Sequence, residues 1–439
     1  MNQPLATVML VLTVSSLATC APLRPGDRAA ASRSSAPVSD LPRPRPVPVW
    51  QTSPAAQIAW LWLQSEGQYL DLIGINGRGR QVARLNGFAA TVGGPWRSAD
   101  GTRILIADGA SLRSFNALNG DEVQTYHDSG GQIVAEAFSP TGRYLALLLF
   151  NAGRLQLEVI DTTTGTVLGP VPVAHAPDAP MPGMQGPPSA WATAAFAPDS
   201  VSIYTLSDWG AQPHISAYSL AGGSLRQLGT APVAVDNCGG PATTIKVVDA
   251  GAAVAAFCHY NAAVWLLDLA TLGKVAVIHP VQSNPFATSP VFTPDGQILF
   301  VLEGQRIQAI DLHSQRLMGP VQISMPNRSG VFSSIASLFV TDAEAGWVAS
   351  TVPIAPDGHS LYLAGSDGIR VLRIPDLTVI ARLAPGVKAN EIWVSGDGRT
   401  LFATTNDAHR LAVIDVDGGG TRSTNLPGNA GGFLSSEHG

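Results

Sequence analysis

Charged side chains are scarce in this chain of 439 residues. Asp, Glu, Lys and Arg make up 13% of it, whereas about 25% is typical of globular domains. Acidic residues outnumber basic ones by 32 to 26, so the formal net charge is −6 and the basic surface expected of a nucleic-acid-binding protein is missing. Hydrophobic residues reach 45%, which excludes a mostly disordered chain.

Standard catalytic motifs are missing as well. The sequence contains no His-Glu-x-x-His zinc motif, no Gly-x-Ser-x-Gly nucleophile elbow, no phosphate-binding Gly-Lys-Ser/Thr loop and no calcium loop with regular carboxylates. Of its three cysteines, the pair Cys238 and Cys258 is too few for a structural zinc site without histidine partners. The enzyme classes that these motifs define are therefore excluded.

The first twenty residues indicate export. An apolar run from Leu5 to Val14 is too short to cross a bilayer about 30 Å thick, and it has the length of a signal-peptide core. The ending Leu17-Ala18-Thr19-Cys20 resembles the lipobox of bacterial lipoproteins, which implies that Cys20 is lipidated and becomes the new N-terminus. An ordinary cleaved signal and an uncleaved anchor are the alternatives. We expect residues 1–20 to be a signal peptide and the protein to be lipid-anchored at the outer face of the cell membrane or in the periplasm.

Residues 21–49 have the composition of a spacer. They are rich in Pro, Ser, Ala and Arg and lack apolar periodicity, so they cannot bury a core. The alternating prolines from Pro42 to Pro48 favour polyproline II, which rises about 3.1 Å per residue. We interpret the segment as a tether between the membrane anchor and a folded body, residues 50–439.

One short turn pattern recurs through that body. A small residue and a variable one are followed by Asp or Thr and then by Gly, which suits a hairpin turn because Gly accepts a positive φ. The third position of the turn falls at residues 100, 141, 199, 250, 295, 357 and 397. The 45 Gly and 33 Pro of the chain likewise favour short strands over long helices.

Each turn introduces a unit of four strands. The turn leads into an apolar strand such as Leu401–Thr405, then a polar loop, then an alternating strand that ends in Asp, such as Leu411–Asp415, and then a second turn and a last strand. The closing Asp residues are expected to cap turns, because their side chains bond turn amides. Four strands in about 40 to 50 residues are the signature of a propeller blade. We predict an all-β protein, a β-propeller of seven or eight four-stranded antiparallel blades.

The units resemble the YVTN-type and WD-repeat-like β-propellers of bacterial secreted proteins. Their pattern, S-P-D-G-x-x-L-Y-V followed by V-x-V-I-D-x-x-T-G, is matched closely at Ala355–Gly365 and Leu411–Asp415, and the resemblance covers residues 55 to 426. It implies the fold and says little about function, because this fold serves many functions.

The number of blades depends on the two ends of the body. Ile58–Leu63, Tyr69–Gly74 and Gln81–Leu85 have the pattern of the last three strands of a further unit. If Gly432-Phe433-Leu434 supplies its first strand, the ring has eight blades and the chain ends are tied together. If the segment instead completes the last unit, there are seven. The count of units favours eight.

Cys238 and Cys258 remain as a pair once Cys20 carries lipid. Cys238 precedes the first strand of a unit and Cys258 ends the next strand, so the reversal of direction places both on one face. In an oxidising compartment we expect a disulfide, worth about 3 kcal/mol in the chain-entropy model. Two free thiols are the alternative.

Candidate ligand residues gather in the loops between second and third strands. Propeller ligands usually bind where these loops and the blade-to-blade connections converge on the central channel. These residues could surround a polar ligand or a divalent metal, but a solvated rim of the loops explains them better. Two insertions, Gly169–Ser189 and Val321–Thr351, are further candidate contact surfaces. The residues are Asp208, Trp209, His214, His259, Asp367, Asn406 and His409.

Two functions follow as hypotheses. The leading one is a non-catalytic, membrane-anchored propeller outside the cytoplasm that binds or scaffolds an unknown protein or small molecule, with no cofactor and no nucleic acid. The alternative is an enzyme. The resemblance to YVTN-like propellers implies lactonase-like, metal-assisted hydrolysis or a role beside a cofactor-dependent dehydrogenase, with the site at the central channel.

Overall fold

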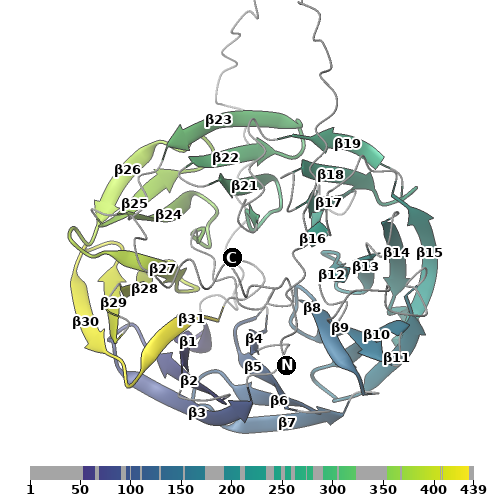
Figure 1. Ribbon diagram of the computed structural model, residues 1–439, viewed down its shortest axis with the longest axis horizontal. Helices are drawn as coiled ribbons and strands as arrows, with labels where there is room; N and C mark the ends of the chain where they lie inside the picture. Colours follow the sequence, from purple (N-terminus) through teal and green to yellow (C-terminus); the bar gives the residue numbers. More distant parts are fainter. Residues whose placement is uncertain are drawn as a thin grey trace, which may run out of the picture. The chain divides into compact units, whose positions relative to one another are not determined.

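The sheets of the computed structural model follow the repeats of the sequence (Figure 1). All described residues belong to one unit, Pro44–Gly439. The expected signal peptide and tether, residues 1–49, lie outside them. The structure describes residues 53–64, 69–89, 95–98, 100–108, 111–127, 130–151, 154–173, 192–207, 213–233, 242–248, 253–258, 263–272, 274–279, 290–303, 306–322, 353–365, 368–405, 407 and 409–434.

Eight antiparallel sheets form the blades of a β-propeller, which confirms the predicted fold class and the larger of the two blade counts. The first four blades take their strands from the following segments. Blade 1 contains β1 (Ala59–Gln64), β2 (Tyr69–Ile75), β3 (Gln81–Ala89) and β31 (Asn429–Phe433); blade 2 contains β4 (Trp96–Arg97), β5 (Arg103–Asp108), β6 (Ser111–Asn116) and β7 (Glu122–His127); blade 3 contains β8 (Gln132–Phe138), β9 (Tyr144–Asn151), β10 (Arg154–Asp161) and β11 (Val167–Pro172); blade 4 contains β12 (Ala192–Phe196), β13 (Ser202–Ser207), β14 (His214–Ser219) and β15 (Arg226–Pro232).

The second half of the ring repeats this plan. In blade 7 a single bridge between Ile354 and Leu361 stands in the place of the first strand. Two short 3-10 turns, η3 (Ala55–Gln57) and η5 (Ala221–Gly223), are the helical segments of the described residues. Blade 5 contains β16 (Ala242–Val248), β17 (Ala253–Cys258), β18 (Ala263–Asp268) and β19 (Lys274–Ile278); blade 6 contains β20 (Val291–Phe292), β21 (Ile298–Glu303), β22 (Arg306–Asp311) and β23 (Arg316–Gln322); blade 7 contains β24 (Ser360–Gly365), β25 (Gly368–Arg373) and β26 (Val379–Leu383); blade 8 contains β27 (Ala389–Val394), β28 (Thr400–Thr405), β29 (Arg410–Asp415) and β30 (Thr421–Asn425).

Within each blade the strands run from the channel outwards, and we call them A, B, C and D in that order (Figure 1). In blade 1 the A strand is β31, which pairs antiparallel with β1 and joins Leu61 to Phe433. The prediction that Gly432-Phe433-Leu434 supplies this strand is therefore confirmed. The chain closes its ring by pairing its last strand with its first.

The core consists of eight clusters of buried apolar side chains, one between each pair of neighbouring blades. The cluster between blades 8 and 1 contains both Leu411 of β29 and Leu61 of β1, so the circle of packed interfaces is complete. Trp60 and Trp265 are fully buried, as their strand positions predict. Trp60 Nε1 also donates a hydrogen bond to the carbonyl of Ala117 at 2.8 Å and so ties blade 1 to blade 2.

A buried arginine secures the same closure. Arg97 of β4 is 2% exposed, and its guanidinium donates to the carbonyls of Ala55 at 2.7 Å and Ile58 at 2.9 Å. It also lies over the ring of Trp393 in blade 8, 5.0 Å from the centroid. Burial lowers the pKa of Arg97 to about 10, against the opposing effect of Asp100, so the side chain stays charged at neutral pH. One side chain thus connects blade 2 to the start of blade 1 and to blade 8.

The described turns between A and B strands share one backbone hydrogen bond, and in blades 2, 3, 6 and 8 a hydroxyl side chain adds a second. In blade 3 the N–H of Gly142 donates to the carbonyl of Ser139 at 2.7 Å, and Ser139 Oγ accepts from the N–H of Tyr144 at 2.9 Å. Gly142 has a φ of 71°, the left-handed conformation that the sequence pattern predicts for this position. In these four blades the repeat therefore specifies the turn through one glycine and one hydroxyl.

Blade 4 departs from this pattern at Ser200. Ser200 has a φ of 62°, is 7% exposed, and its Oγ has no hydrogen-bond partner in the described part of the chain. A side chain in this conformation costs about 1–2 kcal/mol. We expect Ser200→Gly to raise the free energy of unfolding by about 1 kcal/mol in urea denaturation. Gly142→Ala is the matched reverse change and should lower it, because a Cβ there would lie 2.9 Å from Asp100 Cγ. A lower free energy of unfolding for Ser200→Gly would contradict this explanation.

The outer strands carry a recurring β-bulge that pushes an apolar residue outwards. The register of the C and D strands shifts by one residue in blades 1, 2, 4 and 7, and the extra residue is 40% to 62% exposed in each case. Bulges interrupt the row of free backbone groups on an edge strand and so discourage edge-to-edge association. The extra residues are Val82, Val123, Leu228 and Ile380.

Candidate binding face

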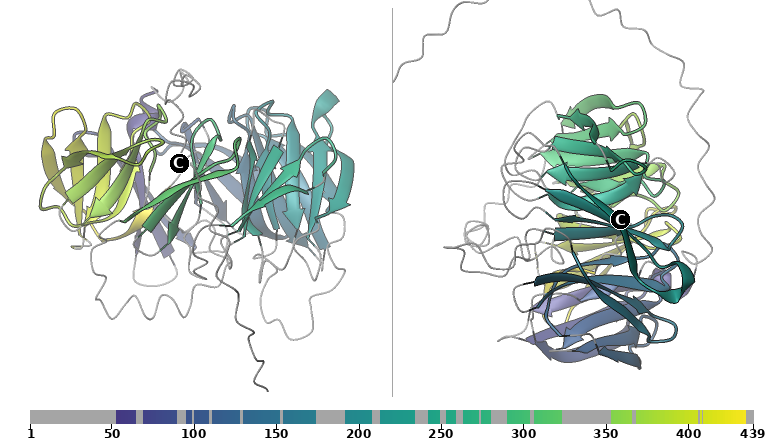
Figure 2. Two further views of the ribbon diagram at one scale, coloured as in Figure 1. Left: turned by 90° about the horizontal axis from the view of Figure 1, so that it is seen from above. Right: turned by 90° about the vertical axis from the view of Figure 1, so that its right-hand side faces the viewer.

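The strand order gives the ring two different faces (Figure 2). Because the strands of each blade are antiparallel, the A–B and C–D turns meet at one face, which we call the turn face. The B–C loops and the D–A connections meet at the other, which we call the loop face. Ligand-binding residues in loops on a rigid scaffold are expected where loop length varies.

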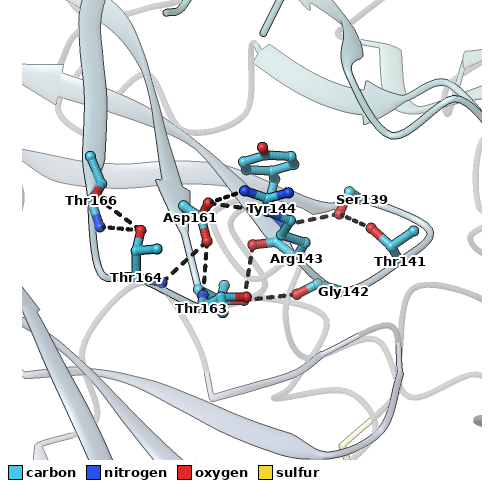
Figure 3. Close-up of polar contacts among 10 residues, drawn as sticks. Ser139, Thr141, Gly142, Arg143, Tyr144, Asp161, Thr163, Thr164 and Thr166 are labelled. Carbon is cyan, nitrogen blue, oxygen red and sulfur yellow. Dashed lines mark hydrogen bonds and ion pairs between the residues drawn. The ribbon is translucent and has the colours of Figure 1, made fainter. Parts of the chain in front are cut away.

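The turn face is uniform and heavily cross-bonded. Blade 3 shows its construction (Figure 3), where Arg143 of the A–B turn donates two hydrogen bonds to Asp161 Oδ2, at 2.9 and 3.1 Å. Asp161 Oδ1 accepts from the N–H groups of Thr163 and Thr164, which confirms that the closing Asp caps the C–D turn. Burial acts to raise the pKa of Asp161, but the hydrogen bonds from Arg143 and the two amides outweigh it and hold the pKa below its usual value.

Every described carboxylate whose pKa is clearly lowered lies on this turn face. The hydrogen bond from Arg373 lowers the pKa of Asp376 to about 2, and the hydrogen bond from Arg113 is the main cause of the lowered pKa of Glu122. These groups are held as turn caps or surface ion pairs, so their ionisation serves the structure. The full set is Glu122, Asp161, Asp199, Asp268 and Asp376.

The loop face differs in the length of its connections. The A–B connections are all short, running over residues 98–102, 139–143, 197–201, 249–252, 293–297 and 395–399. The D–A connections differ widely in length: the shortest is residues 426–428 and the longest is residues 323–353. The first insertion begins after Pro172 rather than at Gly169, because β11 continues through Gly169, and the second begins after Gln322. Variation in loop length is thus concentrated on the loop face.

Two of the predicted rim residues lie among the described residues. His214 is half-buried at the start of β14, where it pairs with Ser207 and Pro232. His409 is exposed just before β29, and its N–H donates to Asp407 Oδ1 at 3.2 Å. Both therefore open C strands on the loop face, and a ligand-binding role for either stays a prediction. The other rim residues, Asp208, Trp209, His259, Asp367 and Asn406, lie outside the described residues.

Of the three cysteines that carry predictions, only Cys258 lies among the described residues. Cys258 is the last residue of β17, where its Cα partners are Ala242 and Ala263, so its backbone lies at the loop face. Cys238 and Cys20 lie outside the described residues. The disulfide and the lipidation stay predictions.

Sequence reasoning missed a feature of the inner strands. Four A strands carry a β-bulge near their start, on the side of the loop face. Bulges are frequent beside binding sites because they re-aim side chains. Asn390 shows the effect, since its Nδ2 turns back to donate to the carbonyl of Thr405 at 3.1 Å. The four extra residues are Val134, Thr243, Asn390 and Gly431. The first three are not glycine, so the sequence carries no turn signal at these positions.

The side chains of Trp62 and Glu391 both lie close to the two glycines of β31. A Cβ on Gly431 would overlap the Trp62 ring, and a Cβ on Gly432 would lie 3.0 Å from Glu391 Oε2 and 2.8 Å from Trp62 Nε1. The two glycines therefore leave the space beside the closing strand that these two side chains occupy. Both side chains are half-buried. Trp393, the neighbouring tryptophan of β27, packs on Phe402 with ring centroids 5.5 Å apart.

Metal-binding groups do not assemble within the described ranges: no three His, Cys, Asp or Glu side chains there lie close enough together to hold an ion. In the same ranges, no helix has the length and apolarity needed to cross a membrane.

Known proteins resemble this chain in fold and not in sequence. No known protein family and no curated protein matches it. The solved structure of the dihydro-heme d1 dehydrogenase NirN in complex with DHE matches 90% of this chain and 77% of its own, with a TM-score of 0.57 and 18% identity. The hydrazine synthase of Kuenenia stuttgartiensis matches 73% of this chain and 94% of its own, with a TM-score of 0.46 and 15% identity. At 18% identity the likeness to NirN shows the propeller fold alone.

Proposed function

We propose that the protein is an exported, lipid-anchored propeller of the YVTN-like and WD-repeat-like type that binds a protein or small ligand through its loop face and performs no catalysis. The observation that carries the proposal is the contrast between the faces. The turn face is a ring of short, mutually bonded hairpins, whereas the loop face has long and variable connections. The signal-like N-terminus and the proline-rich tether support presentation of this body at a membrane.

Histidine modification tests the binding face with a control inside the same chain. His409 is exposed on the loop face and His359 is exposed on the turn face. The full chain is treated with diethyl pyrocarbonate in native membranes and after purification, and both sites are quantified by mass spectrometry. We expect His409 to be protected in membranes and His359 to react equally in both samples. Protection of His359 alone, or equal reaction of His409 in both samples, would overturn the proposed face.

The anchor is tested by substituting its lipidation site. Cys20→Ser should move the chain from the membrane fraction to the soluble extracytoplasmic fraction. Continued sedimentation of Cys20→Ser with membranes would instead favour an uncleaved anchor or membrane association through the folded body.

An enzyme with its site at the central channel is the second candidate. The observation that favours it is the fold likeness to NirN, which was solved in complex with DHE. The predicted rim residues include the carboxylates and imidazoles that metal-assisted hydrolysis needs. Metal analysis and an absorption spectrum of the full chain, purified without chelators, separate the candidates. A stoichiometric metal ion or bound chromophore would favour the enzyme, and neither is expected if the loop face only binds a partner.

A further inference from the structure

The large apolar side chains that remain exposed lie at one level of the outer wall. Each D strand begins at the turn face and ends at the loop face. Within the described ranges, every exposed large apolar side chain lies in a C–D turn or among the first three residues of a D strand, and so at the edge of the turn face. Exposed apolar groups that gather in one region mark a contact surface, whereas single ones scattered over a protein need no explanation. The residues are Val82, Leu118, Val123, Leu228, Leu317, Val379 and Ile380.

Three of these side chains lie on neighbouring turns of blades 1 and 2, whose outer strands β3 and β7 are adjacent on the wall (Figure 1). Val82 follows the C–D turn of blade 1, Leu118 lies in that of blade 2 and Val123 follows it, and the three are 40% to 49% exposed. The two blades touch here, because a Cβ on Gly120 would lie 3.3 Å from Ala83 Cβ. The rim patch, as we call this surface, consists of residues 78–82 and 118–123.

Two free arginines belong to the rim patch. Arg78 and Arg80 are exposed, and their guanidinium groups make no hydrogen bond or ion pair with the described part of the chain. Of the two acidic residues in the patch, Glu122 is paired with Arg113 at 2.6 Å, which leaves Asp121 as the other carboxylate. The patch therefore combines aliphatic side chains with a small excess of positive charge.

The described chain begins on the same face and in the same blade. The turn η3, which directly precedes β1, lies between the A–B turns of blades 8 and 2. The N–H of Gly396 donates to the carbonyl of Ala56 at 2.9 Å, and a Cβ on Gly101 would lie 3.6 Å from Ala56 Cα. The expected tether therefore joins the body at the turn face of blade 1. Residues 21–52 can span at most ~110 Å, which is the reach of the body from an anchor at Cys20.

We propose that the rim patch docks on the bilayer that carries the anchor, with its aliphatic side chains among the headgroups and its arginines on phosphate groups of anionic phospholipids. The inference rests on the proposed lipid anchor. Binding to a membrane surface increases with the apolar area buried and with the attraction of cations to anionic lipids, and the patch offers both. A bilayer is favoured over a protein partner because the anchor keeps the bilayer within reach of this edge of the ring. Docking here leaves the loop face, and His359 of blade 7, outside the contact.

Docking by the rim patch alone is expected to be weak. Three partly exposed aliphatic side chains bury less apolar surface than one acyl chain does, and a single myristoyl chain binds membranes with only about 10⁴ M⁻¹. The patch therefore orients the protein once the anchor holds it, and it does not retain the Cys20→Ser chain at the membrane.

A fluorescent label on the anchored full chain tests the docking. Cys238 and Cys258 are changed to Ser, Cys20 is kept for the lipid, and Gln81→Cys places an NBD fluorophore in the rim patch without removing an arginine or an aliphatic side chain. Ala381→Cys is the matched control, since Ala381 is exposed beside Ile380 at the same edge of blade 7. The chains are reconstituted in vesicles of phosphatidylcholine and phosphatidylglycerol, with or without a phospholipid that carries a nitroxide on its headgroup.

We expect the nitroxide to quench the label at Gln81→Cys several-fold more than the label at Ala381→Cys. Arg78→Gln with Arg80→Gln, or vesicles without phosphatidylglycerol, should lower the quenching at Gln81→Cys towards that of the control. Leu118→Gln should lower it as well, whereas Ile380→Gln, outside the patch, should leave it unchanged.

Equal quenching of the two labels, or quenching at Gln81→Cys that neither the arginine pair nor Leu118→Gln reduces, would overturn the docking. Flotation of the vesicles separates this failure from failure of the anchor. A chain that floats with the vesicles without selective quenching at Gln81→Cys overturns the docking alone. A chain that does not float overturns the anchor and, with it, the docking.

Discussion

A chain that ends at Gly428 is expected to lose its cooperative thermal unfolding transition, whereas a chain that ends at Leu434 keeps it. The shorter chain lacks β31, the A strand of blade 1, so the inner edge of β1 is left unpaired. It also lacks Phe433, which is 6% exposed in the cluster between blades 8 and 1. Loss of a buried Phe side chain alone costs about 3–5 kcal/mol, against about 5–15 kcal/mol for the total stability of a typical domain.

The longer truncated chain is the matched control, because it removes only residues that follow the closing strand. Differential scanning calorimetry and near-ultraviolet circular dichroism distinguish the outcomes. If the chain ending at Gly428 unfolded at the same temperature as the full chain, β31 would not close the ring.

Arg97→Leu should lower the free energy of unfolding by about 3 kcal/mol, because it leaves the carbonyl of Ile58 unpaired and the carbonyl of Ala55 with only its hydrogen bond from the N–H of Ile58. The substitution also removes the contact with the Trp393 ring. Arg97→Lys should recover only part of the loss, because an ammonium cannot reproduce the planar fork that reaches both carbonyls.

Urea denaturation with Arg422→Ala as control measures this effect. Arg422 is exposed on β30, and its truncation should change the free energy of unfolding by less than about 0.5 kcal/mol. An Arg97→Leu variant as stable as Arg422→Ala would show that the arginine does not secure the closure.

Local turn chemistry is what made the fold predictable from sequence. The hairpin at Ser139–Tyr144 depends on a glycine with positive φ and a hydroxyl five residues before the amide that it accepts from, and both are visible in the repeat. The closing strand can be predicted because three segments after residue 57 have the pattern of a unit without its first strand, which Gly432-Phe433-Leu434 near the C-terminus could supply. Patterns that are local and repeated can be read without coordinates.

Contacts between distant segments could not be read in this way. Arg97 resembles any strand-end arginine until η3 is placed beside it, and Leu118 has meaning only when the turn that carries it is known to adjoin β3. The bulge at Asn390 contains no glycine or proline from which it could have been predicted. The candidate site was predicted only as a set of loops, because its residues come from blades far apart in the chain.

A disulfide trap tests the central claim, the closed ring of eight blades, most directly. Gln64 and Asn429 are Cα partners across β1 and β31, whereas Asn425 belongs to β30 and pairs with Arg410. In a full chain with its three native cysteines changed to Ser, Gln64→Cys with Asn429→Cys should form an intramolecular disulfide under mild oxidation, seen as a faster band on a non-reducing gel and confirmed by peptide mass spectrometry. Gln64→Cys with Asn425→Cys should not. Equal cross-linking of the two pairs, or none in the first, would contradict the closure on which the placement of both faces rests.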